Sequence, residues 1–69
     1  VSLRMSNESV LSIQATEARI KEYTIYNMFG IQVVQGSDDT VSLVHLSRGI
    51  YIVHIHFFDA EMVVKKVIK

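Results

Sequence analysis

Hydrophobic and polar residues alternate along most of this chain with a period of two. In the run Ile50–Phe57, the side chains of Tyr51, Val53 and Ile55 fall on one face. This run is also the longest and the richest in β-branched residues, which favour strands. The pattern therefore predicts β-strands.

Seven segments carry this pattern, and polar turn residues separate them. Gly30 lies between the third and fourth segments, where a tight turn requires a positive φ. A helix could begin at residues 17–21, but the strand from Tyr23 would end it early. The predicted strands are Val1–Met5, Val10–Ile13, Tyr23–Asn27, Ile31–Gln35, Thr40–Leu43, Ile50–Phe57 and Met62–Ile68.

Short strands at regular spacing are typical of an all-β antiparallel sandwich, and 69 residues allow one domain. No proline blunts the edge strands, so a homodimer formed by edge-strand exchange is expected. The predicted inward positions are one face of the last strand and Leu3, Val10 or Leu11, Ile13, Ile20, Tyr23, Ile25, Ile31, Val33, Val41, Leu43, Leu46, Tyr51, Val53 and Ile55.

The composition argues against several classes of function. The formal net charge is zero, and nucleic-acid binding would call for a clustered basic face. The chain has no cysteine, so it either stays in a reducing compartment or needs no disulfide. No apolar run is long enough to span a bilayer, and no signal peptide opens the chain. Because it begins at Val1, we expect a piece of a longer protein.

No catalytic pattern is present, and we expect neither an enzyme nor a cofactor. The sequence lacks a Gly-rich phosphate loop and a Gly-x-Ser-x-Gly nucleophile turn. Asp38 and Asp39 are adjacent, so in an extended segment their carboxylates point in opposite directions. Such a pair is typical of a solvated turn.

The histidines are the weak candidates for metal binding. His54 and His56 share one strand face, and His45 could approach them through the neighbouring turn. The sequence fixes no third ligand, so we favour two histidines on the outer face of the strand and no metal site. Phe57 and Phe58 either form a small exposed patch or cover the end of the core, and we favour the latter.

Three motifs in fixed order carry a resemblance to a known family. They are the segments 23–30, Leu46-x-x-Gly49-Ile-Tyr51-Ile-Val53 and Val64–Lys69. Together they resemble the type A C-terminal sorting domain of the type IX secretion system, over roughly positions 10–69. Two features depart from the family pattern: Ser47 replaces a common proline, and the usual Asn-Pro pair near the start is missing.

The resemblance implies a small immunoglobulin-like sandwich that acts as a secretion signal. Residues 1–69 would form one sorting domain attached to the C-terminus of a larger cargo protein. The cargo would cross the periplasm to the outer-membrane translocon. A cell-surface sortase would then remove the domain, and the cargo would commonly be anchored to lipopolysaccharide. The domain itself would be released outside the cell.

Recognition by the translocon and sortase is expected at the C-terminal hairpin. Backbone groups of an exposed edge strand could pair with a strand of the partner. The alternative function is an adhesive or structural immunoglobulin-like module of a surface protein. The expected recognition residues are Gly49, Tyr51, Val53, Lys65, Lys66, Val67, Ile68 and Lys69.

Overall fold

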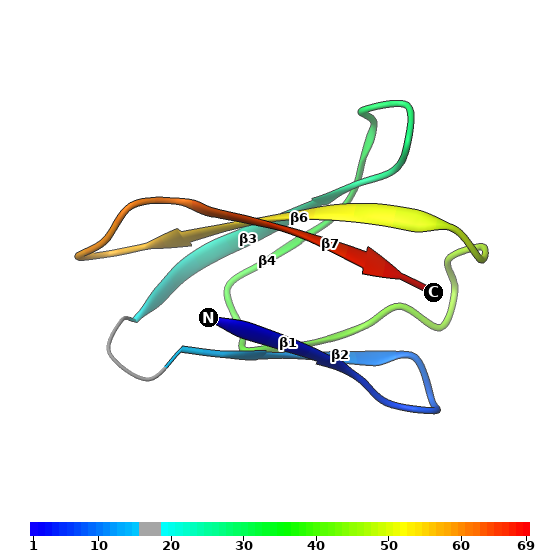
Figure 1. Ribbon diagram of the computed structural model, residues 1–69, viewed down its shortest axis with the longest axis horizontal. Helices are drawn as coiled ribbons and strands as arrows, with labels where there is room; N and C mark the ends of the chain where they lie inside the picture. Colours follow the sequence, from blue (N-terminus) through cyan, green and yellow to red (C-terminus); the bar gives the residue numbers. More distant parts are fainter. Residues whose placement is uncertain (16–18) are drawn as a thin grey trace.

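The computed structural model describes residues 1–15 and 19–69, and these form a sandwich of two antiparallel sheets (Figure 1). The all-β sandwich of seven strands predicted from the sequence is confirmed. In the described residues no helix is long and apolar enough to span a membrane. The strands are β1 (Ser2–Met5), β2 (Val10–Gln14), β3 (Ile20–Tyr26), β4 (Gln32–Gly36), β5 (Thr40–Ser42), β6 (Ile50–Phe57) and β7 (Val63–Ile68).

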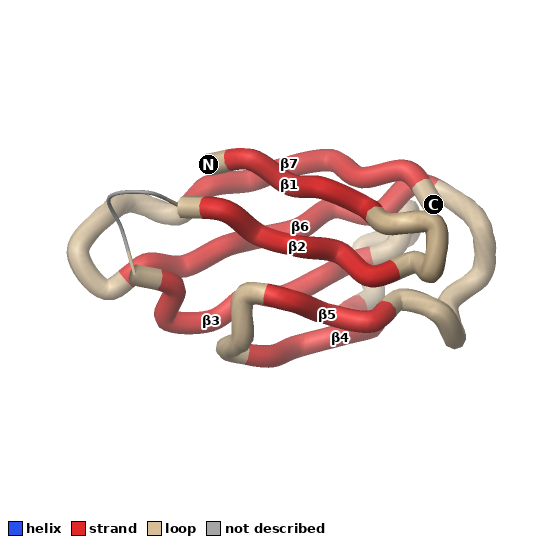
Figure 2. The backbone as a smooth tube through the Cα atoms, turned by 90° about the horizontal axis from the view of Figure 1, so that it is seen from below, coloured by secondary structure: helices blue, strands red, loops and turns tan. Residues whose placement is uncertain are grey.

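The two sheets have the strand orders β1-β2-β5 and β4-β3-β6-β7. Figure 2 shows β1 stacked over β7 and β2 over β6, with β5 and β4 together at the opposite border. The chain passes between the sheets at that border through the loop 37–39. Strand β6 pairs with both β3 and β7, so the four-stranded sheet is organised around it.

The core lies between the sheets and follows the predicted alternation closely. Five side chains are almost fully buried, and each contributes about 1.5–3 kcal/mol through removal from water. Val10 is only half-buried, so Leu11 is the inward residue of that pair. Phe57 is also buried and belongs to the core, whereas Phe58 is exposed. The five are Leu11, Ile25, Leu43, Val53 and Ile55.

Ile31 was predicted to face the core, and this prediction is wrong. Its side chain is 59% exposed because Ile31 belongs to the β3–β4 turn rather than to a strand. The Asn27 side chain holds that turn, since its Oδ1 accepts hydrogen bonds from the amides of Phe29 (2.9 Å) and Ile31 (3.0 Å). Gly30 adopts a φ of 79° in the same turn. The next strand therefore starts one residue later, at Gln32.

The helix considered for residues 17–21 is absent from residues 19–21, the part of that segment that the structure describes. Ile20 and Lys21 belong to β3, and Ile20 pairs with Phe57 of β6. Residues 16–18 lie outside the described part of the chain. Pairing with β6 outweighs the weak helical preference of this short segment.

Candidate functional site

The hairpin of β6 and β7 carries the residues expected to be recognised. Its strands pair in antiparallel register from Ile55 opposite Val63 to Ile50 opposite Ile68. One further backbone pair extends the ladder, because the Lys69 amide donates to the Gly49 carbonyl at 2.9 Å and the Gly49 amide donates back at 3.3 Å. We call residues 49–69 the terminal hairpin. Gly49 and Lys69 therefore lie side by side at its open end.

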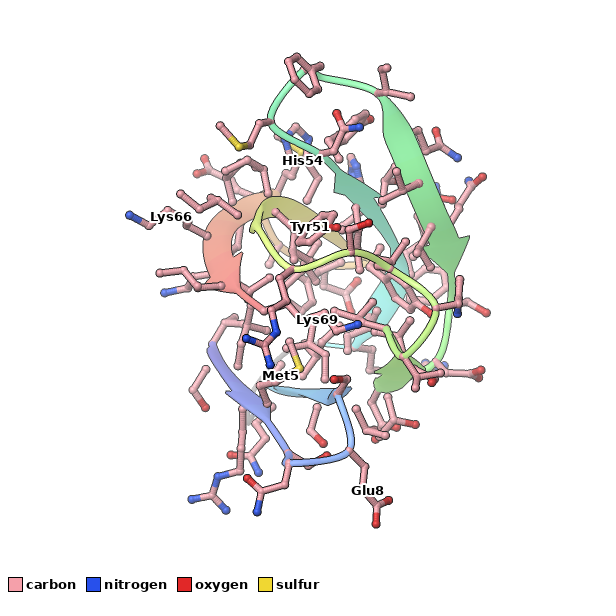
Figure 3. All side chains as sticks on the ribbon, turned by 90° about the vertical axis from the view of Figure 1, so that its right-hand side faces the viewer. Met5, Glu8, Tyr51, His54, Lys66 and Lys69 are labelled. Carbon is pink, nitrogen blue, oxygen red and sulfur yellow. The ribbon has the colours of Figure 1, made fainter. Side chains whose placement is uncertain are left out.

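The Lys69 ammonium binds the loop that precedes β6. Its Nζ donates hydrogen bonds to the backbone carbonyl oxygens of Leu43 (2.7 Å), Val44 (3.3 Å) and Leu46. An ammonium has three donors, so all of them are used here. In Figure 3 the Lys69 side chain runs back toward the interior, whereas Lys66 points out into solvent. We call this three-carbonyl arrangement the lysine clasp.

Tyr51 ties the same loop from the β6 side. Its hydroxyl donates to the Ser47 carbonyl oxygen at 2.6 Å, while its ring is buried in the core. Ser47 thus serves the turn through its backbone, which any residue at this position could supply. Residues 43–49 are fastened to both strands of the terminal hairpin, by Tyr51 on β6 and by Lys69 beyond β7.

Steric contacts within the domain do not require glycine at position 49. A Cβ built on it would meet no other atom within 4 Å, and its φ is outside the left-handed region. Gly49 lines a groove of about 390 Å³ together with Phe29, Val33 and Arg48. The fold therefore leaves open space at Gly49, which a partner could occupy.

The other expected recognition residues divide between the two faces of the terminal hairpin. Lys66 and Ile68 are exposed on the outer face of the sheet. Lys65 lies opposite Val53, on the core side of the edge strand, and is half-buried. A partner that docks on the folded domain can touch the exposed residues directly. The buried residues Tyr51, Val53 and Val67 can only hold the hairpin in shape.

The histidines do not converge on one point. His54 packs against the Tyr26 ring, with 4.7 Å between ring centroids, on the outer face of the four-stranded sheet. His45 lines the groove beside Gly49, and His54 lines a different one. Within residues 1–15 and 19–69, no three His, Cys, Asp or Glu side chains are grouped closely enough to hold a metal ion. The described residues thus offer no support for the approach of His45 to His54 and His56 considered from the sequence.

Sequence reasoning missed two structural roles. The lysine clasp joins residues 23 or more positions apart, and no local pattern signals such a contact. The strand predicted to end at Gln35 includes Gly36, which lies opposite Tyr23. A Cβ on Gly36 would lie 2.7 Å from Cζ of the Tyr23 ring, so glycine is required there. Burial, followed by the nearby charge of Asp38, raises the pKa of Tyr23 above its ordinary value.

Replacing Lys69 with methionine tests the clasp. We expect the free energy of unfolding to fall by about 1.5–2 kcal/mol, because hydrogen bonds from a charged donor to backbone carbonyls are lost. Urea denaturation followed by circular dichroism measures this change. Lys66→Met is the matched control, since Lys66 is exposed, and its effect should stay within about 0.5 kcal/mol. Equal effects of both substitutions would contradict a structural role for the clasp.

Comparison with known proteins yields one family. The sequence model of the family described as "Secretion system C-terminal sorting domain" matches residues 7–69. The match includes all of the terminal hairpin and begins just after β1. No curated protein and no solved structure matches the chain.

Proposed function

This chain belongs to the family of secretion system C-terminal sorting domains, and on that premise we propose that the outer-membrane translocon reads the terminal hairpin as a folded surface. A type IX sorting domain implies a cargo protein attached on its N-terminal side, a secretion machinery, and delivery to the cell surface or beyond. The single observation that supports the proposed recognition surface is the lysine clasp, which joins the end of β7 to the loop 43–49.

The proposed surface consists of the exposed side of the terminal hairpin and the space beside Gly49. Lys66 and Ile68 supply side-chain contacts, and the open environment of Gly49 lets a partner approach the backbone closely. Tyr51 and Lys69 act as positioning residues, because their hydrogen bonds to the loop fix where Gly49 lies relative to β7. Recognition then depends on folding, since the loop and β7 are brought together only in the folded domain.

The free edge of β7 offers a second mode of contact. Strand β7 is the last strand of its sheet, so its outward backbone groups can pair with a strand of a partner. Lys65 lies on the core side of that edge, and an inward charge discourages unselective pairing. A partner strand would need a carboxylate near Lys65, which makes such pairing selective.

The proposed route has an export stage and a processing stage. The cargo crosses the inner membrane and the periplasm, the folded domain engages the translocon, and the cargo passes the outer membrane. A cell-surface sortase then cuts on the N-terminal side of the domain, joins the cargo to lipopolysaccharide, and the domain is released. The family match supports the secretion of an attached cargo, which is the part of the route that the rest builds on. Val1 is 47% exposed at the border of the sandwich, so a segment attached before it would start in solvent, within reach of a protease.

An export assay in a host with a type IX system tests the proposal. Cargo carrying the intact domain is compared with cargo whose domain lacks Val64–Lys69. We expect the intact form to reach the surface and lose the domain, and the truncated form to stay in the periplasm. Because the truncation removes β7 and could unfold the domain, Lys66→Glu combined with Ile68→Glu serves as a second variant that changes only exposed side chains. Equal export of all forms would leave an adhesive or structural module as the better account.

A further inference from the structure

The outer faces of the two sheets differ in polarity. On the sheet β1-β2-β5, the face away from the core carries Arg4, Ser12, Gln14 and Ser42, with Val10 as a half-buried apolar neighbour. On the four-stranded sheet, the corresponding face is richer in apolar side chains. Over β6 and β7 it carries Ile50, Ile52, Val64 and Ile68 together with His54, His56 and Lys66, and Tyr26 of β3 and Met28 of the β3–β4 turn adjoin them. A surface of this kind on one face only indicates a contact site.

A groove occupies one end of this apolar face. Ile50, Ile52 and the packed ring pair of Tyr26 and His54 line it, and Met28 from the β3–β4 turn contributes to its wall. Its volume is about 520 Å³. In Figure 3 the labelled residues Lys66 and His54 both lie on the side of the sheet turned away from β1 and β2. The groove end of the face is thus apolar with a lysine beside it.

The β6–β7 turn, at the opposite end of the sheet, carries complementary groups. The β6–β7 turn exposes Phe58 (58%) and Met62 (46%), and the exposed carboxylates Asp59 and Glu61 lie between them. Phe58 stacks with the Arg19 guanidinium, 5.4 Å from the ring centroid, which holds the aromatic ring at the surface. The groove at the other end would accept the apolar side chains of this turn, and Lys66 beside the groove would pair with one of its carboxylates.

We propose that the outer face of the four-stranded sheet binds a second copy of this chain about a two-fold axis. The axis lies between the two packed faces, near His54, and runs across the strands. It places the β6–β7 turn of each copy over the groove of the other. Lys66 pairs with Ile52, two residues from His54 along β6. Glu61 lies in the β6–β7 turn, beyond the Ile55–Val63 pair on the other side of His54, and its side chain is exposed. The rotation therefore brings Lys66 of one copy close to Glu61 of the other, and does so twice.

The dimensions of the domain suit such a dimer. From Ile50 to Phe58 the strand rises about 26 Å, at about 3.3 Å per residue, which fits within the longest extent of 33 Å. A stable interface buries about 800 Å² per partner. The broad side of the domain measures 33 by 25 Å, so most of the apolar face would have to be covered. We therefore expect a weak dimer, with a dissociation constant of about 10–100 μM.

Edge-strand exchange, expected from the sequence, is the competing arrangement. It would pair one of the edge strands β1, β4, β5 or β7 with a second copy and leave the apolar face exposed. Lys65 on the core side of β7 works against pairing at that edge, whereas the outward positions of β6 carry no Asp, Glu, Lys or Arg. The face-to-face dimer also covers Lys66 and Ile68. If the proposed function holds, self-association and docking to the machinery compete.

Charge reversal tests the dimer. Sedimentation velocity of the 69-residue chain from about 5 μM to about 1 mM should show a mass rising from 7.9 kDa toward twice that value. Lys66→Glu and Glu61→Lys should each raise the dissociation constant about tenfold, because each places like charges together. The double variant Lys66→Glu/Glu61→Lys should restore the dissociation constant to within about threefold of the original.

Arg4→Glu on the polar sheet is the matched control and should leave the dissociation constant unchanged, since Arg4 lies outside the proposed interface. A chain that stays monomeric up to about 1 mM overturns the proposal. A dimer whose dissociation constant is unchanged by both single charge reversals also overturns it, and would indicate edge-strand exchange. The measurement uses no secretion machinery, so its failure is independent of the sorting function.

Discussion

Gly36→Ala is expected to lower the free energy of unfolding by about 2–3 kcal/mol, because an added methyl group in a packed site forces its neighbours to shift. A Cβ at this position would overlap the Tyr23 ring, approaching Cζ to 2.7 Å. Tyr23 is only 4% exposed, so its ring has little room to move. For a domain of this size, total stability is about 3–10 kcal/mol. The substitution therefore removes a large share of it.

Urea denaturation monitored by circular dichroism gives the change in stability. Gly49→Ala is the matched control, because a Cβ there meets nothing within 4 Å. That variant should be unchanged or more stable by up to about 1 kcal/mol, since alanine restricts the unfolded chain. If Gly36→Ala proved as stable as the original, the close packing of Tyr23 on β4 would be wrong.

Gly49→Ala is expected to reduce export of the attached cargo about tenfold or more, although the domain stays folded. A methyl group in a close contact costs about 1–3 kcal/mol, which corresponds to about a tenfold loss of affinity or more. The domain itself leaves the space at Gly49 open, so the penalty arises only when a partner occupies it. Quantitative immunoblotting of surface and periplasmic fractions measures the effect.

Gly30→Ala separates recognition from stability in the same assay. Gly30 has a φ of 79°, where an L-residue costs about 1–2 kcal/mol. It should therefore destabilise the domain more than Gly49→Ala does, yet impair export less. If Gly30→Ala instead reduced export more than Gly49→Ala, export would follow stability. Gly49 would then not be part of the surface that the translocon recognises.

The alternation of side chains revealed the fold because each strand has one buried face. β6 matches its predicted bounds, Ile50–Phe57, and its buried and more exposed positions alternate without interruption. The failure at Ile31 has a local cause. Asn27 hydrogen-bonds to the amides of the turn, and this side-chain contact overrides the apolar character of Ile31.

Much of the candidate site could not be read from the chain. The motif around Gly49 and Tyr51 marked the right hairpin, because a tight loop and a strand leave local signals. The clasp depends on Lys69 meeting carbonyl oxygens of a loop more than 20 residues earlier. Backbone acceptors carry no sequence signature, so only the three-dimensional structure reveals their lysine partner.

The central position of β6 has a consequence for how this domain acquires its structure. Strands β1 and β2 form one hairpin and β3 and β4 another, but the pairing of β3 with β6 closes a loop of about 30 residues. Such distant pairing slows folding, and isolated hairpins are only marginally stable in water. We therefore expect residues 1–49 alone to be much less stable than the whole domain, because the core faces of β1-β2-β5 and of the β3–β4 hairpin lack the packing that β6 supplies. The whole sandwich assembles in one late, cooperative step, once β6 is available to join its neighbours.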